Sequence, residues 1–136
     1  MDLLDTQVFG IIGEAGFTRL VAAFYRRVPD DDILGPLYPK PDMIGAERRL
    51  RQFLIQRFGG PDHYSQTRGH PRLRARHARF KVDPAARDRW VKLMHEALEE
   101  VQLPPSAIPA LRQFFNEAST FLLNHPGPAG PEAGDG

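Results

Sequence analysis

The sequence of 136 residues contains no cysteine. This absence excludes disulfide bonds and metal sites built from thiolates, and it leaves the redox compartment undecided. An excess of charge of one sign is also lacking, because 18 Lys and Arg residues against 17 Asp and Glu residues leave a net charge of +1. No overall electrostatic field therefore draws the chain onto nucleic acid or an acidic membrane, and neither is expected as a partner.

Long apolar runs are missing as well, since none approaches the ~18 residues that a membrane span needs. The first residues, Met1-Asp2-Leu3-Leu4-Asp5, carry acidic side chains where a signal peptide carries basic ones. We therefore expect a cytoplasmic protein.

The length of the chain suits one domain, which we place at residues 1–125. Pro, Gly and Ala dominate residues 126–136, which cannot bury enough apolar surface to order themselves and are expected to be disordered.

Apolar residues recur at helical spacing along most of the chain, and neither an alternating strand pattern nor an internal repeat is present. The spacing predicts a helix through residues 17–28 and a second over about 44–58, which Gly59-Gly60-Pro61 ends. A third helix is predicted to begin near Pro84, a residue that suits the first helical turn, and a fourth covers 108–122. The sequence therefore predicts an all-α fold.

An ordinary four-helix bundle is one interpretation of this pattern. The connection over residues 59–82 argues against it, because connections in bundles usually have ~2–8 residues and a longer one suggests a wrap around something. The inward faces also carry aromatic residues that suit a flat apolar ligand, although core packing accounts better for each one taken singly. These residues are Phe24, Phe53, Phe58, Trp90 and Phe114.

Histidines are the candidates for metal ligation in a chain without thiolates. They are His63, His70, His77, His95 and His125. We expect His95, at the edge of an apolar stripe, to meet solvent, and His125 leads into the tail. The other three are spaced by seven residues and would form a metal-binding row on a continuous helix, but Gly69 and Pro71 break such a helix. A zinc site of three histidines is therefore disfavoured, and His95-Glu96 without a second histidine is not the zincin motif.

Basic residues cluster between the second and third predicted helices. Taken alone, this cluster is either a solvated charged loop or a patch that contacts phosphate, with Tyr64 and Phe80 nearby. The cluster consists of Arg68, Arg72, Arg74, Arg76, Arg79 and Lys81.

Several separated motifs follow one another in a specific order over about residues 8–124. They are Phe24-Tyr25-Arg26, Leu37-Tyr38-Pro39, Ala46 to Leu54, Gly59-Gly60-Pro61, Tyr64-Ser65, Arg68 to Ala78 and Arg87-Asp88-Arg89-Trp90. In residue type and spacing they resemble the group II truncated haemoglobins. The resemblance implies a globin-like two-over-two helical sandwich around one haem b per chain.

The resemblance also implies which residues hold the haem. It places the proximal iron ligand on His77, and without cysteine the haem would be held non-covalently. The haem propionates are carboxylates, which arginine binds in bidentate geometry, so Arg76 is expected to contact them together with Tyr64. Other residues expected to contact the haem are Leu50, Phe53, Leu54, Trp90 and Met94.

On the ligand side of the haem, Ala46 stands where many globins carry a distal histidine, so hydrogen-bond donors have to come from elsewhere. Tyr25, Tyr38 and Trp90 match family positions that line the ligand pocket, and Leu50 supplies an apolar wall. A buried Tyr or Trp that only satisfies its own polar group is the alternative. Two hydrogen bonds of ~1.5–3 kcal/mol each would slow ligand release by on the order of a hundredfold or more.

The sequence departs from the family pattern at a few positions. Ile12-Gly13 replaces paired glycines, so the first turn is expected to differ, while Arg79 replaces a proline and Phe58 a tryptophan.

The family suggests reversible binding of dioxygen and other diatomic ligands at a pentacoordinate iron, by a monomer or homodimer. The alternative is a nitric oxide dioxygenase or peroxidase, which would need an external reductase because the sequence has no flavin or nicotinamide motif.

Overall fold

The computed structural model describes residues 3–38, 40–69 and 82–123. These residues form only helices and connections. The α-helices are α1 (Val8–Arg27), α2 (Met43–Arg57), α3 (His63–Arg68), α5 (Pro84–Val101) and α6 (Ile108–Phe121). Short 3-10 helices are η1 (Asp5–Gln7), η2 (Gly35–Leu37), η3 (Lys40–Asp42) and η4 (Pro105–Ala107). The all-α prediction is therefore confirmed.

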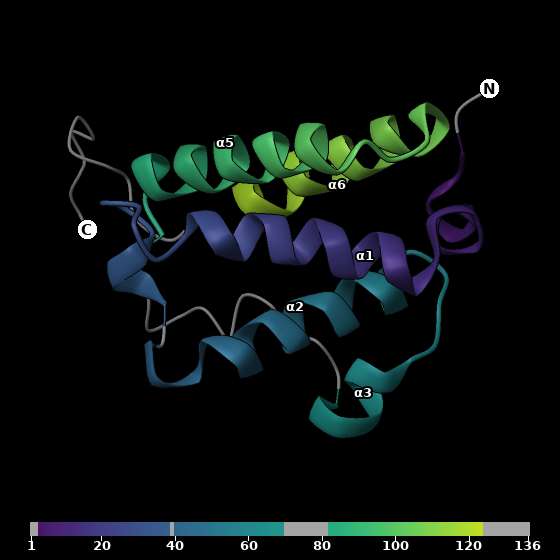
Figure 1. The fold of residues 1–136 in the computed structure, drawn as a ribbon, viewed down its shortest axis with the longest axis horizontal. Coiled ribbons are helices and arrows are strands. Elements are labelled where there is room, and N and C mark those ends of the chain that lie inside the picture. The colour runs from purple at the N-terminus through teal and green to yellow at the C-terminus, as the bar shows by residue number, and fades with distance from the viewer. Residues whose placement is uncertain (1–2, 39, 70–81, 124–136) are drawn as a thin grey trace.

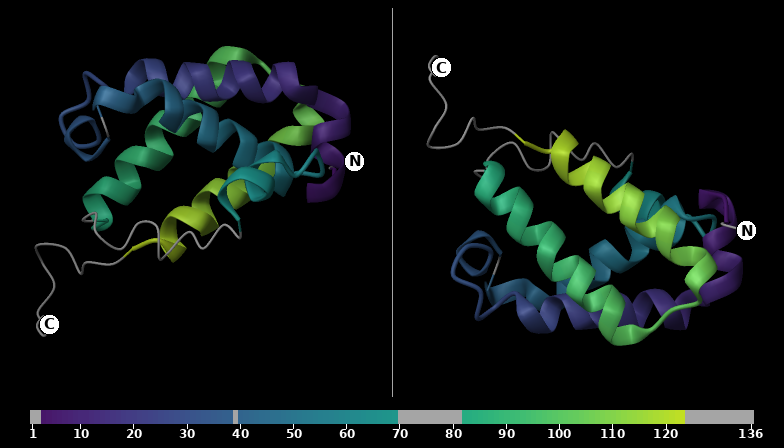
Figure 2. Two further views of the ribbon diagram at one scale, coloured as in Figure 1. Left: turned by 90° about the horizontal axis from the view of Figure 1, so that it is seen from below. Right: turned by 90° about the horizontal axis from the view of Figure 1, so that it is seen from above.

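The long helices pack in two layers. Figure 1 shows α1 between α5 above and α2 below, and α6 lies beside α5. The views from below and above show α1 and α2 on one side of the molecule facing α5 and α6 (Figure 2). This arrangement is the expected two-over-two sandwich rather than a bundle of parallel neighbours.

The first helix contains a bend at Gly13. Its φ of 66° and ψ of 179° lie outside the helical range, in a region that residues with a Cβ rarely adopt. The helix predicted over 17–28 is thus the second half of α1, and the single glycine of Ile12-Gly13 is sufficient to bend the chain. The bend lets the second half lie across α5 while the first half reaches the end of α2, where Phe9 N donates to Phe58 O at 2.9 Å.

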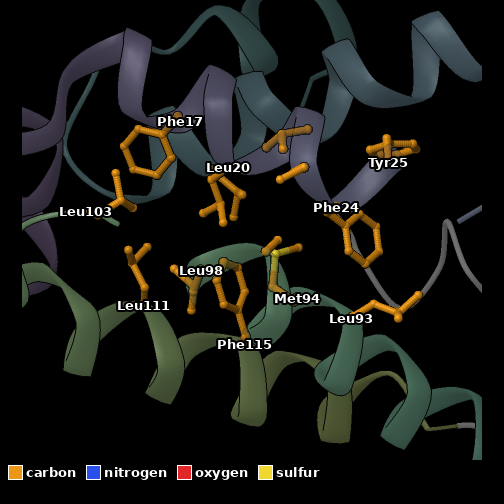
Figure 3. Packing of buried hydrophobic residues seen from close by; sticks show 14 of the residues in the cluster. Phe17, Leu20, Phe24, Tyr25, Leu93, Met94, Leu98, Leu103, Leu111 and Phe115 are labelled. Atoms are coloured by element: carbon orange, nitrogen blue, oxygen red, sulfur yellow. The ribbon is translucent and has the colours of Figure 1, made fainter. Parts of the chain in front are cut away.

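The core lies where α1 crosses the other layer. Phe17, Leu20 and Phe24 point from α1 toward Met94 and Leu98 of α5 and toward the α6 side chains Leu111 and Phe115 (Figure 3). All are buried, and each such side chain contributes about 1.5–3 kcal/mol when it leaves water. This cluster fixes α1 against α5 and so sets where their neighbouring polar residues meet.

The connection after α2 is not wholly irregular, in contrast to the sequence prediction. Residues His63–Arg68 form α3, which ends at Gly69 with a φ of 77°. Gln56 of α2 holds this helix, because its Oε1 accepts from Ser65 N at 2.9 Å and its Nε2 donates to Ser65 Oγ at 2.8 Å. These contacts come from another element, which is why the local pattern did not predict them.

One helix in the described part of the chain, Asp5–Arg27, is long and apolar enough to cross a membrane by length and composition alone. The expectation that no segment reaches this limit was therefore too strict. Core helices meet the same criteria, and half of the apolar window lies buried inside the protein.

Candidate functional site

Three residues expected on the ligand side come together from different elements. Tyr25 lies on α1, Tyr38 follows η2, and Trp90 lies in the first half of α5. The rings of Tyr25 and Tyr38 meet edge to face with centroids 5.6 Å apart. The ring of Phe24 lies beside them, with its centroid 5.5 Å from that of Trp90 and 6.4 Å from that of Tyr38. We call Tyr25, Tyr38 and Trp90 the polar aromatic group.

The polar atoms of this group are protonated donors. The indole N–H of Trp90, which can only donate, forms a hydrogen bond with the side chain of Tyr38. Burial raises the pKa of Tyr38 to about 12, against the opposing effect of that hydrogen bond. Burial also raises the pKa of Tyr25, with smaller contributions from Tyr38 and Glu47 that Arg49 opposes. Both hydroxyls therefore keep their protons at neutral pH.

Ala46 of α2 is buried in the core cluster, and its side chain offers no hydrogen-bond donor. Asp42 fixes the start of the helix, because its side chain accepts from Gly45 N at 3.2 Å and from Arg49 at 3.1 Å. That a donor to a ligand comes from other elements stays a prediction.

A layer of half-buried apolar side chains continues from this point. Leu50 and Phe53 of α2 are only partly covered, as are Trp90 and Phe114. Phe53 lies 5.5 Å from the ring of Tyr64 and 6.2 Å from that of Phe114. Large apolar side chains left half covered on three helices fit the apolar faces of a haem, and the polar aromatic group fits its ligand side.

Other residues expected to contact the haem lie deeper. Leu54 and Met94 are buried within the core cluster. Tyr64 is buried on α3, beside Phe53. Arg76 lies outside the described residues.

The expected iron ligand, His77, also lies outside the described residues, as do His70 and His125. Among the residues that the structure describes, no group of three His, Asp or Glu side chains could hold a metal ion. His63 is exposed on α3. The assignment of the iron ligand therefore stays a prediction.

His95 corrects one expectation. It was expected to meet solvent, and it is partly exposed, but its Nε2 atom is buried and has no hydrogen-bond partner among the described residues. Burial lowers the pKa of its imidazole, and the nearby Arg112 and Arg87 lower it further while Glu99 opposes them. Protonation of His95 is therefore disfavoured in the folded chain.

The sequence reasoning missed a charged contact next to Trp90, which joins Arg89 to Asp31 and Asp32. Arg89 NH1 donates to Asp31 Oδ1 at 2.6 Å and to Asp32 Oδ1 at 2.8 Å. Asp31 belongs to the acidic run that follows Pro29, and no role in the site was predicted for this run. Its partner lies 58 positions further along the chain, a distance at which no local pattern indicates a contact.

Comparison with known proteins adds to this geometry. The model of the bacterial-like globin family matches residues 7–123. Group 2 truncated hemoglobin YjbI of Bacillus subtilis is 40% identical over 92 residues, which cover 68% of this chain and 69% of that protein.

Solved structures show the same fold. The hemoglobin of Chloroflexus aurantiacus has a TM-score of 0.83 and 42% identity, covering 87% of this chain and 98% of that one. The truncated oxygen-avid haemoglobin of Bacillus subtilis has a TM-score of 0.82 and 33% identity, covering 86% of this chain and 98% of that one. The two-over-two arrangement is thus common to this chain and to these haemoglobins.

Proposed function

Because the chain belongs to the bacterial-like globins, and within them to the group II truncated haemoglobins, we propose that it binds dioxygen and related diatomic ligands reversibly at one haem b. Haem and a small diatomic ligand are what the family implies; the haem type, the stoichiometry and the roles of single residues are our proposal. The observation that carries it is the polar aromatic group, which gathers hydrogen-bond donors beside a half-buried apolar layer.

We assign the haem contacts as follows. His77 would ligate the iron, and Arg76 and Tyr64 would hold the propionates. Leu50, Phe53 and Phe114, which the structure leaves half-buried, would pack against the ring. When bound, the haem supplies an iron atom that takes up a diatomic ligand reversibly.

The chain's own residues then decide how long the ligand stays. The N–H of Trp90 is engaged with Tyr38 in this structure. A partly negative diatomic ligand is a stronger acceptor than a neutral hydroxyl, so we propose that Trp90 turns its N–H from Tyr38 to the ligand. Tyr25 is the second donor, because its buried hydroxyl is protonated. Ala46 leaves room for the ligand and makes no hydrogen bond to it.

The test of the iron ligand compares His77→Gly with His70→Ala. The wild type is expected to purify red with one haem b per chain, and resonance Raman of the ferrous form should show an iron–histidine stretch. That stretch should vanish in His77→Gly and persist in His70→Ala. Its loss in His70→Ala or His63→Ala instead would overturn the assignment, and a colourless wild type would overturn the proposed function.

A second candidate activity is nitric oxide dioxygenation or peroxidase chemistry at the same site. The polar aromatic group favours it, because donors that slow ligand release give a second small reactant time to arrive. We propose that turnover requires an external reductase as electron donor. Nitrate formation from nitric oxide and dioxygen should then be sustained only when a reductase is added. Equal rates without one would contradict the need for this partner.

A further inference from the structure

A charged link joins the loop after α1 to α5, one position before Trp90. Arg89 contacts Asp31 at 2.6 Å and Asp32 at 2.8 Å. Only 8% of the Asp31 side chain is exposed, against 83% for Asp32, so solvent screens the first contact far less. Asp31 is therefore the partner that can fix the position of Arg89.

Asp31 is itself tied to the loop that ends at Tyr38. Its Oδ2 accepts from Ile33 N at 3.0 Å and from Leu34 N at 2.8 Å. Its carbonyl oxygen accepts from Gly35 N at 3.0 Å, and Gly35 O accepts from Tyr38 N at 3.3 Å. A series of hydrogen bonds thus runs from Asp31, whose carboxylate holds Arg89, to Tyr38, which holds the N–H of Trp90.

These contacts close a ring of interactions. Arg89 and Trp90 are neighbours on α5, and Asp31 and Tyr38 belong to the loop after α1. The ion pair joins Arg89 to Asp31, and the hydrogen bond joins Trp90 to Tyr38. We propose that Asp31 and Arg89 are positioning residues that hold Tyr38 against Trp90 and so set how readily Trp90 releases its N–H to a ligand. The claim about ligand release rests on the proposed function; the claim about the hydrogen bond does not.

The ion pairs that Arg27 of α1 forms with α5 do not contact the residues around Trp90. Arg27 contacts Glu96 at 3.5 Å and Glu100 at 2.7 Å, in the second half of α5 and away from Trp90. The carboxylate of Asp31 also stays charged: burial alone would raise its pKa, but the amide of Leu34, the guanidinium of Arg89 and the amide of Ile33 together hold the pKa below its ordinary value. The link is therefore present throughout the neutral range.

The experiment uses the fact that Trp90 is the only tryptophan of the chain. Ultraviolet resonance Raman of the full chain then reports the hydrogen bond at the indole N–H of this residue alone. The variants are Arg89→Gln, which leaves the amide contacts of Asp31 intact, and Arg89→Lys, which keeps the charge. Arg87→Gln is the matched control, because Arg87 is similarly exposed on the same helix but contacts Thr120 and Asn116 of α6, each at 3.2 Å.

We expect Arg89→Gln to shift the indole band toward a weaker hydrogen bond, Arg89→Lys to restore it in part, and Arg87→Gln to leave it unchanged. In the haem-loaded chain, Arg89→Gln should also slow dioxygen release by about two- to tenfold, as one neutral competing hydrogen bond is weakened. An unchanged band in Arg89→Gln, or an equal shift in Arg87→Gln, would overturn the positioning role. A shifted band with unchanged release would overturn its effect on the ligand, whereas a Trp90→Phe variant with wild-type release would point to failure of the proposed function instead.

Discussion

Trp90 and Tyr38 share one hydrogen bond, so substitutions at the two positions should move ligand release in opposite directions. Trp90→Phe removes a donor to the ligand and should speed dioxygen release roughly tenfold or more, since a hydrogen bond to a charged acceptor contributes ~1.5–3 kcal/mol. Tyr38→Phe removes the competitor for the same N–H and should slow release several-fold. Stopped-flow measurement of dioxygen release decides this, with Tyr25→Phe expected to give a smaller acceleration than Trp90→Phe. Faster release in Tyr38→Phe would mean that Tyr38 itself donates to the ligand.

His95 should make the fold sensitive to mild acid. Its pKa is lowered in the folded chain, chiefly by burial, so an unfolded imidazole with a pKa of about 6.5 binds a proton more readily than the folded one. The stabilising contribution is full above about pH 6.5 and is lost as the pH falls from there toward the folded pKa. His95→Gln should therefore lose less stability than the wild type between about pH 7.5 and 5.5. Urea unfolding at both pH values measures this, with exposed His63→Gln as the control; parallel losses in the wild type and His95→Gln would contradict it.

At the residue scale, the sequence predicted the polar aromatic group but not the charges that hold it. Tyr25, Tyr38 and Trp90 lie in motifs with a family resemblance, and each is a residue type that stands out. Asp31 and Arg89 are ordinary surface types, and their meaning depends on a contact between residues 58 positions apart. Periodicity and local motifs carry no information about such a pair.

Among the elements, the junction between η1 and the end of α2 depends on one glycine. Gly59 has a φ of 101°, and a Cβ at this position would overlap the carbonyl oxygen of Thr6. Gly59→Ala therefore combines backbone strain with a backbone clash and should destabilise the fold by about 2–4 kcal/mol. Gly10→Ala is the control, because a Cβ there meets nothing within 4 Å and alanine favours a helix, which should stabilise by about 0.5–1 kcal/mol. Chemical unfolding of both variants checks this, and equal effects would contradict it.

The elements also differ in how far the sequence predicted them. α2, α5 and α6 bury one face each at helical spacing, so periodicity found them within a few residues. α3 has only six residues, too few to be stable alone, and it forms where Gln56 bonds to Ser65. The bend at Gly13 lies where the family pattern places a turn, but periodicity alone does not indicate it, because apolar residues continue on both sides.

On the scale of the whole molecule, periodicity left the arrangement of the helices open. Four amphipathic helices suit a bundle as well as a sandwich, and the family motifs were needed to choose between them. The physical sign of the sandwich is the apolar layer of Leu50, Phe53, Trp90 and Phe114, which remains half-buried after the helices have packed. A bundle core would have covered these side chains, whereas a fold that takes up a flat cofactor leaves them accessible.

Removal of the haem should therefore weaken the whole fold and not only the site. The haem binds the folded chain, and a ligand held at a thousand times its dissociation constant stabilises by about 4 kcal/mol. For a chain of this length that corresponds to a thermal midpoint on the order of 10 °C lower in the haem-free protein. Calorimetry of the loaded and haem-free chains measures the difference, and Leu50→Ala should reduce it, because the haem would cover the exposed part of this side chain. Exposed Ile44 on the same helix, changed to Ala, should leave the difference unaltered. Identical midpoints with and without haem would mean that the half-buried layer is covered by something else.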